Sequence, residues 1–343
     1  MTTMPVILLD EQRRIVLSER PVPAPGSGQV LVDVDLCGIC GSDLHSPDLP
    51  QVYLGGFVLG HEASGVVREV GADVEGWAVG QRVAVNPNGN VCGVCAYCLS
   101  GRFNFCHQAT MKTALGLQAD GALAPVMVAA SSTLRALPDA MGRVEAAWVE
   151  PTATALRAVL LAGDLAGATV LVSGGGPIGQ LVCRIAAHLG AGRVVLVEPT
   201  PERRGFAPAS RVDVALTPAE AQTRLTHADD PLRADIAIEC SGNASATTLA
   251  LTALRPGGVL VVVGSGVGAT LDPLVILLNE ITVRGSFTYV DEFEQAIDLL
   301  TSKAIRVDDL TTAVVPLSEA LAAFESLRAA QTMKILIEPH HSS

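Results

Sequence analysis

The stretch ATVLVSGGGPIGQLVCRIAAHLG, residues 168–190, joins an apolar strand to an amphipathic helix through a glycine-rich turn. The turn has the G-x-G-x-x-G spacing, which alone occurs in many chains, but the strand before it and the helix after it are the context of a dinucleotide-binding motif. The helix N-terminus supplies N–H donors and positive potential for a pyrophosphate. A glycine-rich turn without a nucleotide is the less favoured interpretation. The predicted cofactor contacts here are Gly174, Gly176, Pro177, Ile178 and Gly179.

Strand-like and helix-like segments continue to alternate after this turn. Further apolar runs are RVVLVEP (193–199), VDVAL (212–216), ADIAIECSG (234–242) and GGVLVVVGSG (257–266). Near-continuous apolar strands separated by helices predict a parallel sheet covered on both faces. We therefore expect residues 151–285 to form a doubly wound, Rossmann-type α/β domain.

The strand 193–199 ends in Glu198, nineteen residues after Gly179. A carboxylate at this place accepts hydrogen bonds from the adenosine ribose hydroxyls and repels a 2′-phosphate, so it favours NAD over NADP. Arg203 is a further predicted cofactor contact, and together with Arg204 it could soften that preference.

The pattern of predicted strands, turns and helices is different before and after this α/β segment. Before residue 150, strand-like runs such as VLVDVDLCG and QRVAVNPN are separated by Gly, Pro and Asp turns, which predicts a β-rich domain. After residue 285, FEQAIDLLTSK and LSEALAAFESLRAAQ are predicted helices and MKILIEP is a predicted strand. We expect this tail to return to the first domain, so that residues 1–150 and 286–343 form one domain into which 151–285 is inserted.

The length and net charge of the chain limit the kinds of molecule that it can bind. The chain has 343 residues, enough for two domains, and a net charge of −12, which argues against nucleic acid or an anionic membrane. No apolar run has the length of a transmembrane helix, and the start, MTTMPVILLDEQRR, lacks the basic region of a signal peptide. A cytoplasmic location is the prediction.

Four cysteines are clustered in NVCGVCAYCLSGRFNFC (90–106): Cys92, Cys95, Cys98 and Cys106. Four thiolates on a short loop suit tetrahedral zinc, and a closed four-sulfur shell leaves no position for substrate. We therefore predict a structural zinc lobe at 88–107. Two disulfides, an iron–sulfur cluster and a nucleic-acid-binding zinc ribbon are the less favoured alternatives.

A second group of metal-binding residue types is dispersed along the chain. CGICGSDLH (37–45) contains Cys40, VLGHEASG (58–65) contains His61 and Glu62, and WVEPTA (148–153) contains Glu150 where the two predicted domains join. A thiolate, an imidazole and a carboxylate with one open position form a catalytic zinc pattern. Plainer interpretations are a buried Cys40, a surface His45 and a Glu150 that only begins a helix.

These segments, taken in order, resemble the zinc-dependent medium-chain alcohol and polyol dehydrogenases. The motifs that carry the resemblance are GICGSDLH, GHE, the four-cysteine lobe, VEP, GGGPIG, ECSG, LRPGG and RGSF. The resemblance implies a GroES-like catalytic domain beside the Rossmann domain. It implies catalytic zinc on Cys40, His61 and Glu150, with Glu62 able to replace Glu150. It also implies that Asp43 orients His61, and that the substrate proton leaves through Ser42 and His45.

The function that the resemblance implies is hydride exchange between NAD(H) and a secondary alcohol, polyol or sugar-like hydroxyl, in a homodimer or homotetramer. Two alternatives stay open: an NADPH-dependent reductase of aldehydes or ketones, and a catalytically silent binding protein. The chain departs from the family in three places. The segment 106–127 keeps the general pattern of the family but contains no sequence that indicates one substrate. The segment 46–60, between His45 and His61, is short, so that Tyr53 and Phe57 are only candidate pocket residues, and Gly205 and Pro208 interrupt the helix expected after Glu198.

Overall fold

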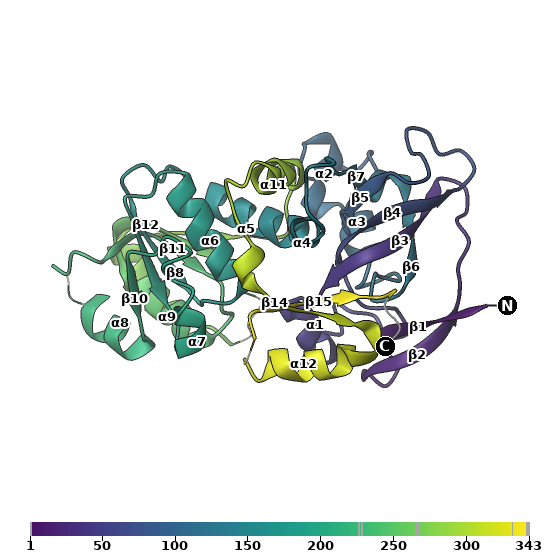
Figure 1. The fold of residues 1–343 in the computed structure, drawn as a ribbon. Helices are drawn as coiled ribbons and strands as arrows, with labels where there is room; N and C mark the ends of the chain where they lie inside the picture. The colour runs from purple at the N-terminus through teal and green to yellow at the C-terminus, as the bar shows by residue number, and fades with distance from the viewer. Residues whose placement is uncertain (1, 226, 228, 265–267, 331, 341–343) are drawn as a thin grey trace. The chain divides into compact units, whose positions relative to one another are not determined.

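The computed structural model describes residues 2–225, 227, 229–264, 268–330 and 332–340. Two compact units make up the chain. Unit 1 contains Met1–Glu150 and Phe293–Ser343, and unit 2 contains Pro151–Glu292. Unit 1 is thus built from both ends of the sequence, the purple-to-blue and yellow parts of Figure 1. Residues 286–292, which we expected in the first domain, fall in unit 2.

Unit 2 is built on a six-stranded sheet with the order β10-β9-β8-β11-β12-β13, in which all neighbours are parallel. Numbered from β8, this order is 3-2-1-4-5-6, the order of a doubly wound dinucleotide-binding sheet. The five residues of β8 are all buried, as a central parallel strand requires. The strands are β8 (Thr169–Ser173), β9 (Arg193–Val197), β10 (Val214–Leu216), β11 (Ala234–Glu239), β12 (Leu254–Val262) and β13 (Thr282–Gly285).

Helices connect these parallel strands. Helix α6 packs on β8 and β9, and α9 packs on β11 and β12 (Figure 1). Gly205 ends α7 after one turn, in line with the interruption expected after Glu198. The apolar segment ATTLALTALRPGG (246–258) predicts a helix ended by Pro256 and Gly257, but α9 ends at Thr252 and LRPGG begins β12. The helices are α5 (Val149–Leu161), α6 (Pro177–His188), α7 (Pro201–Arg204), α8 (Pro218–Leu225), α9 (Ala244–Thr252) and α10 (Pro273–Leu278).

Unit 1 has a mostly antiparallel sheet with the order β14-β15-β3-β4-β5-β7, to which β6 is added by pairing with β3. A separate hairpin, β1-β2, completes its strands. The pairing of β15 with β3 joins the end of the chain to its beginning. The strands are β1 (Thr3–Leu9), β2 (Ile15–Pro21), β3 (Gln29–Gly38), β4 (Glu62–Val70), β5 (Arg82–Val85), β6 (Val126–Ala130), β7 (Leu134–Ala136), β14 (Thr311–Pro316) and β15 (Lys334–Glu338).

The core of unit 1 contains apolar residues from both chain ends: Ile7 and Leu9 of β1, and Phe324 of α12, are fully or nearly fully buried in it. The α-helices are α1 (Gly41–Leu44), α2 (Ala96–Leu99), α3 (His107–Met111), α4 (Arg143–Ala147), α11 (Glu292–Thr301) and α12 (Ala320–Arg328). The 3₁₀ turns are η1 (Ser46–Asp48), η2 (Phe103–Phe105), η3 (Ser131–Thr133), η4 (Asp308–Leu310) and η5 (Leu317–Glu319). Within the part of the chain that is described, no helix is long and apolar enough to cross a membrane.

Candidate active site

The first turn of α1 and the start of β4 bring Cys40, His61 and Glu62 together in unit 1. One donor atom from each lies within 4.8 Å of the others, and His61 and Glu62 are buried. Gly60 allows this approach because its backbone has φ +94°, and a Cβ there would lie 2.7 Å from Cys37 Sγ. A thiolate, an imidazole and a carboxylate at this separation are a donor set that fits zinc.

Asp43 is fully buried behind these residues and holds them in place. Its Oδ2 accepts a hydrogen bond from the Cys40 backbone N–H at 3.0 Å, and its Oδ1 lies 3.4 Å from His61 Nδ1. This contact would leave Nε2 of His61 available to a metal, the usual arrangement around metal-binding histidines. Burial lowers the pKa of His61, but the negative charges of Asp43 and Cys40 outweigh it and raise this pKa well above its ordinary value. The site is therefore built to hold positive charge.

Ser42 and His45 lie at the same turn. The Ser42 hydroxyl is 3.2 Å from Cys40 Sγ and 2.7 Å from the hydroxyl of Tyr53. Tyr53 is fully buried and also donates to Asp43 Oδ1 at 3.0 Å. His45 ends α1 and is exposed, as the solvent end of a proton path requires. The sequence indicated Ser42 and His45 but gave no sign of this link between Tyr53 and Ser42.

Lys334, the first residue of β15, is a site residue that sequence reasoning missed. Its Nζ forms a buried ion pair with Glu62 and donates to the Ile39 carbonyl at 3.0 Å. It also lies 5.6 Å from the centre of the Trp148 ring. Burial lowers the pKa of Lys334, but Glu62 and Cys40 raise it further, so the pKa lies above its ordinary value and the ammonium is charged. A lysine opening the otherwise apolar run KILI was the available signal.

Glu150 lies in the first turn of α5, at the end of the first part of unit 1. It is not a member of the group formed by Cys40, His61 and Glu62. Its role as a third zinc ligand therefore stays a prediction.

The four cysteines of the lobe form a second group. One sulfur from each lies within 4.8 Å of the others, and Cys98 is 3.5 Å from Cys95 and 3.9 Å from Cys92. Tetrahedral zinc with bonds of about 2.3 Å places its sulfurs about 3.8 Å apart, whereas a disulfide needs about 2 Å. None of the four is in a disulfide, and their spacing fits a structural zinc.

The surroundings of two of these sulfurs shift their pKa values in opposite directions. Burial raises the pKa of Cys106, but backbone N–H groups of Cys92 and Ala109 and the neighbouring thiols lower it to about 6 overall. Burial, followed by the hydrogen bond with Cys95, raises the pKa of Cys98 to about 12. Four thiolates cannot share this small volume unless a cation compensates their charge, so binding a divalent metal would release protons.

The glycine-rich turn between β8 and α6 has the shape that the motif predicts. Gly174 has φ +97°, and a Cβ on Gly179 would lie 1.8 Å from the Gly174 carbonyl oxygen, so neither position accepts a larger residue. Gly176 is the N-cap of α6 and Pro177 its first residue. This leaves the N-terminus of a twelve-residue helix without a side-chain cap of its own, a surface on which a pyrophosphate can bind.

Glu198 is buried at the end of β9, beside this turn. Its two carboxylate oxygens accept from the backbone N–H groups of Gly175 at 2.6 Å and of Thr200 at 2.8 Å. Arg203 reaches toward the same turn, with a terminal nitrogen 3.9 Å from where a Cβ on Gly176 would lie. Its Nε has no hydrogen-bond partner among the described residues. A carboxylate and a guanidinium whose buried Nε has no hydrogen-bond partner among the described residues thus lie at one glycine-rich turn.

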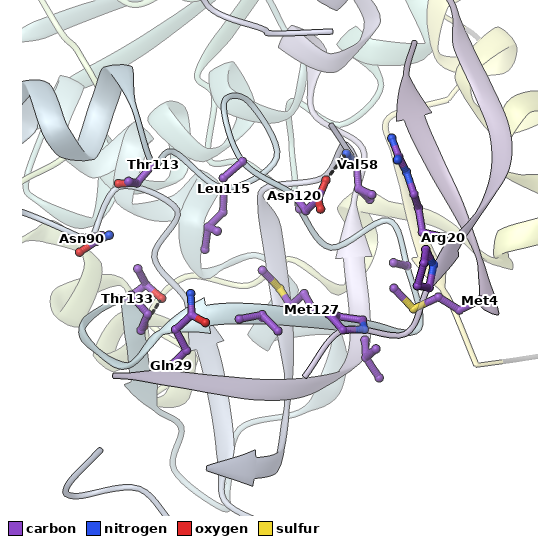
Figure 2. Close-up of a pocket in the computed structure, with 18 residues that line it drawn as sticks. Met4, Arg20, Gln29, Val58, Asn90, Thr113, Leu115, Asp120, Met127 and Thr133 are labelled. Carbon is purple, nitrogen blue, oxygen red and sulfur yellow. Dashed lines mark hydrogen bonds between the residues drawn. The ribbon is translucent and has the colours of Figure 1, made fainter. Parts of the chain in front are cut away.

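A pocket of about 300 Å³ also opens in unit 1, and Figure 2 shows its lining. Met4, Arg20 and Met127 line it, and the Asp120 carboxylate there accepts from the Val58 backbone N–H at 2.9 Å (Figure 2). None of the predicted site residues lines this pocket.

Comparison with known proteins identifies the family. Residues 26–139 match the alcohol dehydrogenase GroES-like domain, and residues 177–302 match the zinc-binding dehydrogenase family. The D-xylulose reductase A of Aspergillus niger is 34% identical over 345 residues, which cover 96% of this chain and 95% of that protein. The chain is a zinc-binding dehydrogenase of the medium-chain alcohol and polyol dehydrogenase family. The predicted GroES-like and Rossmann folds are confirmed.

Solved structures agree with this dehydrogenase fold over its full length. A protein of Sinorhizobium meliloti 1021, bound to NADP, has a TM-score of 0.90 and 30% identity, covering 99% of this chain and 100% of that one. The 2R,3R-butanediol dehydrogenase of Bacillus subtilis has a TM-score of 0.85 and 29% identity, covering 98% and 100%. The dehydrogenase is therefore an oxidoreductase that uses zinc and a nicotinamide nucleotide to interconvert an alcohol or polyol and its carbonyl form.

Proposed function

We propose that this dehydrogenase oxidises a secondary alcohol, polyol or sugar-like hydroxyl to the ketone, and catalyses the reverse reduction, with NAD(H) as its cofactor. The observation that carries the proposal is the group of Cys40, His61 and Glu62 beside the Ser42 hydroxyl. The relatives named for D-xylulose and 2R,3R-butanediol support a vicinal polyol or diol as the substrate class.

The residues of unit 1 bind and orient the reacting hydroxyl. When bound, zinc supplies Lewis acidity that lowers the pKa of a substrate hydroxyl, and the nicotinamide nucleotide supplies the hydride acceptor. Cys40 and His61 would hold the metal, and Asp43 would fix the imidazole. Either Glu62 or Glu150 would complete the protein ligands, and the ion pair with Lys334 is the contact that would hold Glu62 back.

Proton movement is the task of Ser42 and His45. The Ser42 hydroxyl, close to Cys40 Sγ, would accept the proton from the substrate oxygen as its own proton passes outward, and exposed His45 would deliver that proton to water. An imidazole is suited to this step because it titrates near neutral pH.

The preference for NAD over NADP is proposed from Glu198. Its buried carboxylate faces the glycine-rich turn and would repel a 2′-phosphate. Arg203 acts in the opposite direction, and the structural relative bound to NADP shows why both nucleotides need testing.

Glu198→Ala should weaken NAD binding and narrow the ratio of the two dissociation constants, measured by fluorescence titration. Glu202→Ala, at an exposed position in α7, is the matched control. Tighter NADPH than NADH binding by the unmodified protein would contradict the preference.

The direct test of the activity is a panel of secondary alcohols, diols, pentitols and hexitols assayed for NADH formation, with zinc measured on the same preparation. Turnover of at least one vicinal diol or polyol, with two zinc ions per chain, is the expected result. Metal analysis giving two zinc ions but no turnover of any substrate would favour the silent binding protein instead.

We further propose that the dehydrogenase is a homo-oligomer and works in the cytoplasm. All four residues of β13 are exposed, and among the described strands β13 pairs only with β12. Leu274, Leu277 and Leu278 of the adjacent α10 segment are 58%, 71% and 71% exposed. An open sheet edge next to exposed leucines is a surface that a second copy can cover. The cytoplasm would keep the cysteine ligands reduced.

A further inference from the structure

The short segment after His45 is held firmly by residues from elsewhere in unit 1. Arg13, in the β1-β2 hairpin, donates from its guanidinium to the carbonyls of Ser46, of Pro47 at 2.7 Å and of Tyr53 at 3.2 Å. From the other side, the Gln118 amide donates to the Val52 carbonyl at 3.1 Å. The segment therefore has a fixed position. Its only tyrosine, Tyr53, is held at the site by this fixed backbone.

The hydrogen bonds of Tyr53 can be assigned by counting protons. Its ring is fully buried, and its hydroxyl contacts Ser42 Oγ at 2.7 Å and Asp43 Oδ1 at 3.0 Å. An ionised carboxylate only accepts, so the one phenolic proton goes to Asp43. The one Ser42 hydrogen then has two acceptors in reach, the Tyr53 hydroxyl at 2.7 Å and Cys40 Sγ at 3.2 Å, and the shorter contact favours donation to Tyr53.

Without the phenol, Ser42 has a competing acceptor. The remaining partner of its hydroxyl is Cys40 Sγ at 3.2 Å. A serine that donates to a metal-binding thiolate is turned away from the direction in which it would receive a substrate proton. Burial, and then the charges of Asp43 and Cys40, raise the pKa of Tyr53 well above its ordinary value, so the phenol stays neutral. The charged groups that face this hydroxyl are Asp43 and Cys40, while Arg13 contacts the segment through carbonyl oxygens.

We propose that Tyr53 is a positioning residue for the proton transfer: it accepts the Ser42 hydroxyl proton, donates its own to Asp43, and so keeps a Ser42 lone pair directed at the substrate hydroxyl. The proposal rests on the proposed function, since it assigns to Tyr53 the orientation of the serine in that reaction. During the transfer Ser42 gains the substrate proton and gives up its own hydrogen toward His45, so its hydrogen bond to Tyr53 belongs to the resting site and Tyr53 neither gains nor loses a proton.

The test compares Tyr53→Phe, Ser42→Ala and the double variant in the full-length zinc-loaded enzyme. The probe is (2R,3R)-butane-2,3-diol with NAD, replaced by xylitol if the unmodified enzyme does not oxidise the diol. We expect Tyr53→Phe to lower kcat about 10-fold at pH 7, part of the ~10²–10⁴-fold effect of general acid–base catalysis, with KM nearly unchanged. The deficit should shrink toward pH 10, because hydroxide then replaces the relay.

The double variant separates positioning from packing. If Tyr53 acts through Ser42, adding Tyr53→Phe to Ser42→Ala should lower kcat by less than about twofold, because residues that act as a unit are not additive. Zinc content and the unfolding midpoint should equal those of the unmodified enzyme. Tyr97→Phe, at a 43% exposed position, is the matched control and should change nothing.

Three results would overturn the proposal: an unchanged kcat in Tyr53→Phe, a deficit independent of pH, or a full deficit retained in the Ser42→Ala background. If Tyr53→Phe does not fold, Arg13→Gln loosens the same segment, and its deficit in kcat should likewise vanish when Ser42 is alanine. Absence of turnover by the unmodified enzyme would instead count against the proposed function, so the two failures are distinct.

Discussion

At the scale of single residues, the buried pair of Lys334 and Glu62 is the most demanding feature of unit 1. Both side chains are 2% exposed, so each charge depends on the other. Gly38 makes room for the pair, because a Cβ there would lie 2.9 Å from Lys334 Cε. Removing one partner of such a pair is more damaging than removing both, because it leaves an uncompensated charge in the interior.

Lys334→Met should therefore destabilise unit 1 by about 3–5 kcal/mol, the range for breaking a buried ion pair from one side. The measurement is the free energy of unfolding in denaturant, on metal-depleted protein so that zinc loss does not contribute. Lys303→Met is the matched control: Lys303 pairs with Glu145 but is 48% exposed, and such pairs contribute about 0–1 kcal/mol. Equal effects of the two substitutions would contradict this account of Lys334.

Cys40 allows a second prediction at this scale. Cys40→Ser should abolish turnover and remove about one zinc per chain, because a serine hydroxyl stays neutral and binds zinc poorly. Since Cys40 is only partly buried, the unfolding midpoint of the metal-depleted protein should barely change. Activity, zinc content and midpoint are measured together, with Cys183→Ala in the core of unit 2 as the control. Unchanged turnover would exclude Cys40 as an essential ligand.

At the scale of elements, predictability from sequence follows how local an interaction is. The cysteine lobe and the glycine-rich turn lie within 15 and 6 consecutive residues (92–106 and 174–179), so the cysteine spacing, and the glycine spacing between a strand and a helix, indicated their chemistry. Tyr53 and Lys334 meet Ser42 and Glu62 only after strands have paired, and a phenol or an ammonium in the sequence does not reveal its partner. The strand start at Leu254 was also missed, because Pro256 and Gly257 usually end regular structure.

The lobe gives the prediction at the element scale. Cys98→Ser should lower zinc content by about one per chain and lower the unfolding midpoint, because structural zinc binding contributes directly to folding. The loss of stability should be absent when both proteins are compared after chelation. Full stability with unchanged zinc content would count against a structural zinc site.

At the scale of the whole molecule, the alternation of strands and helices was enough to predict a parallel sheet, and the observed order β10-β9-β8-β11-β12-β13 agrees with it. The return of the chain's end to its beginning was also expected, and β15 does pair with β3. The sequence did not predict that the chain passes from unit 2 to unit 1 at residue 293 rather than 286. Residues 286–292 have no hydrophobic periodicity that assigns them to the core of one unit.

Assembly is the prediction that belongs to this scale. Leu277→Glu should shift the protein toward monomers in sedimentation velocity, because it puts a charge among the exposed leucines beside β13. Leu99→Glu, at a position of similar exposure in the cysteine lobe (77%), is the control and should leave the sedimentation coefficient unchanged. A monomeric unmodified protein would exclude the proposed oligomer altogether.

The joining of both chain ends in unit 1 has a consequence for biosynthesis. A ribosome releases the strands of unit 2 by residue 285, whereas β14 and β15 emerge only after residue 311. Unit 2 can thus begin folding during translation, while the nascent N-terminal segment must wait for its last two strands. Until then Glu62 has no lysine beside it, so a stalled or shortened polypeptide would present an incomplete first domain to chaperones and proteases.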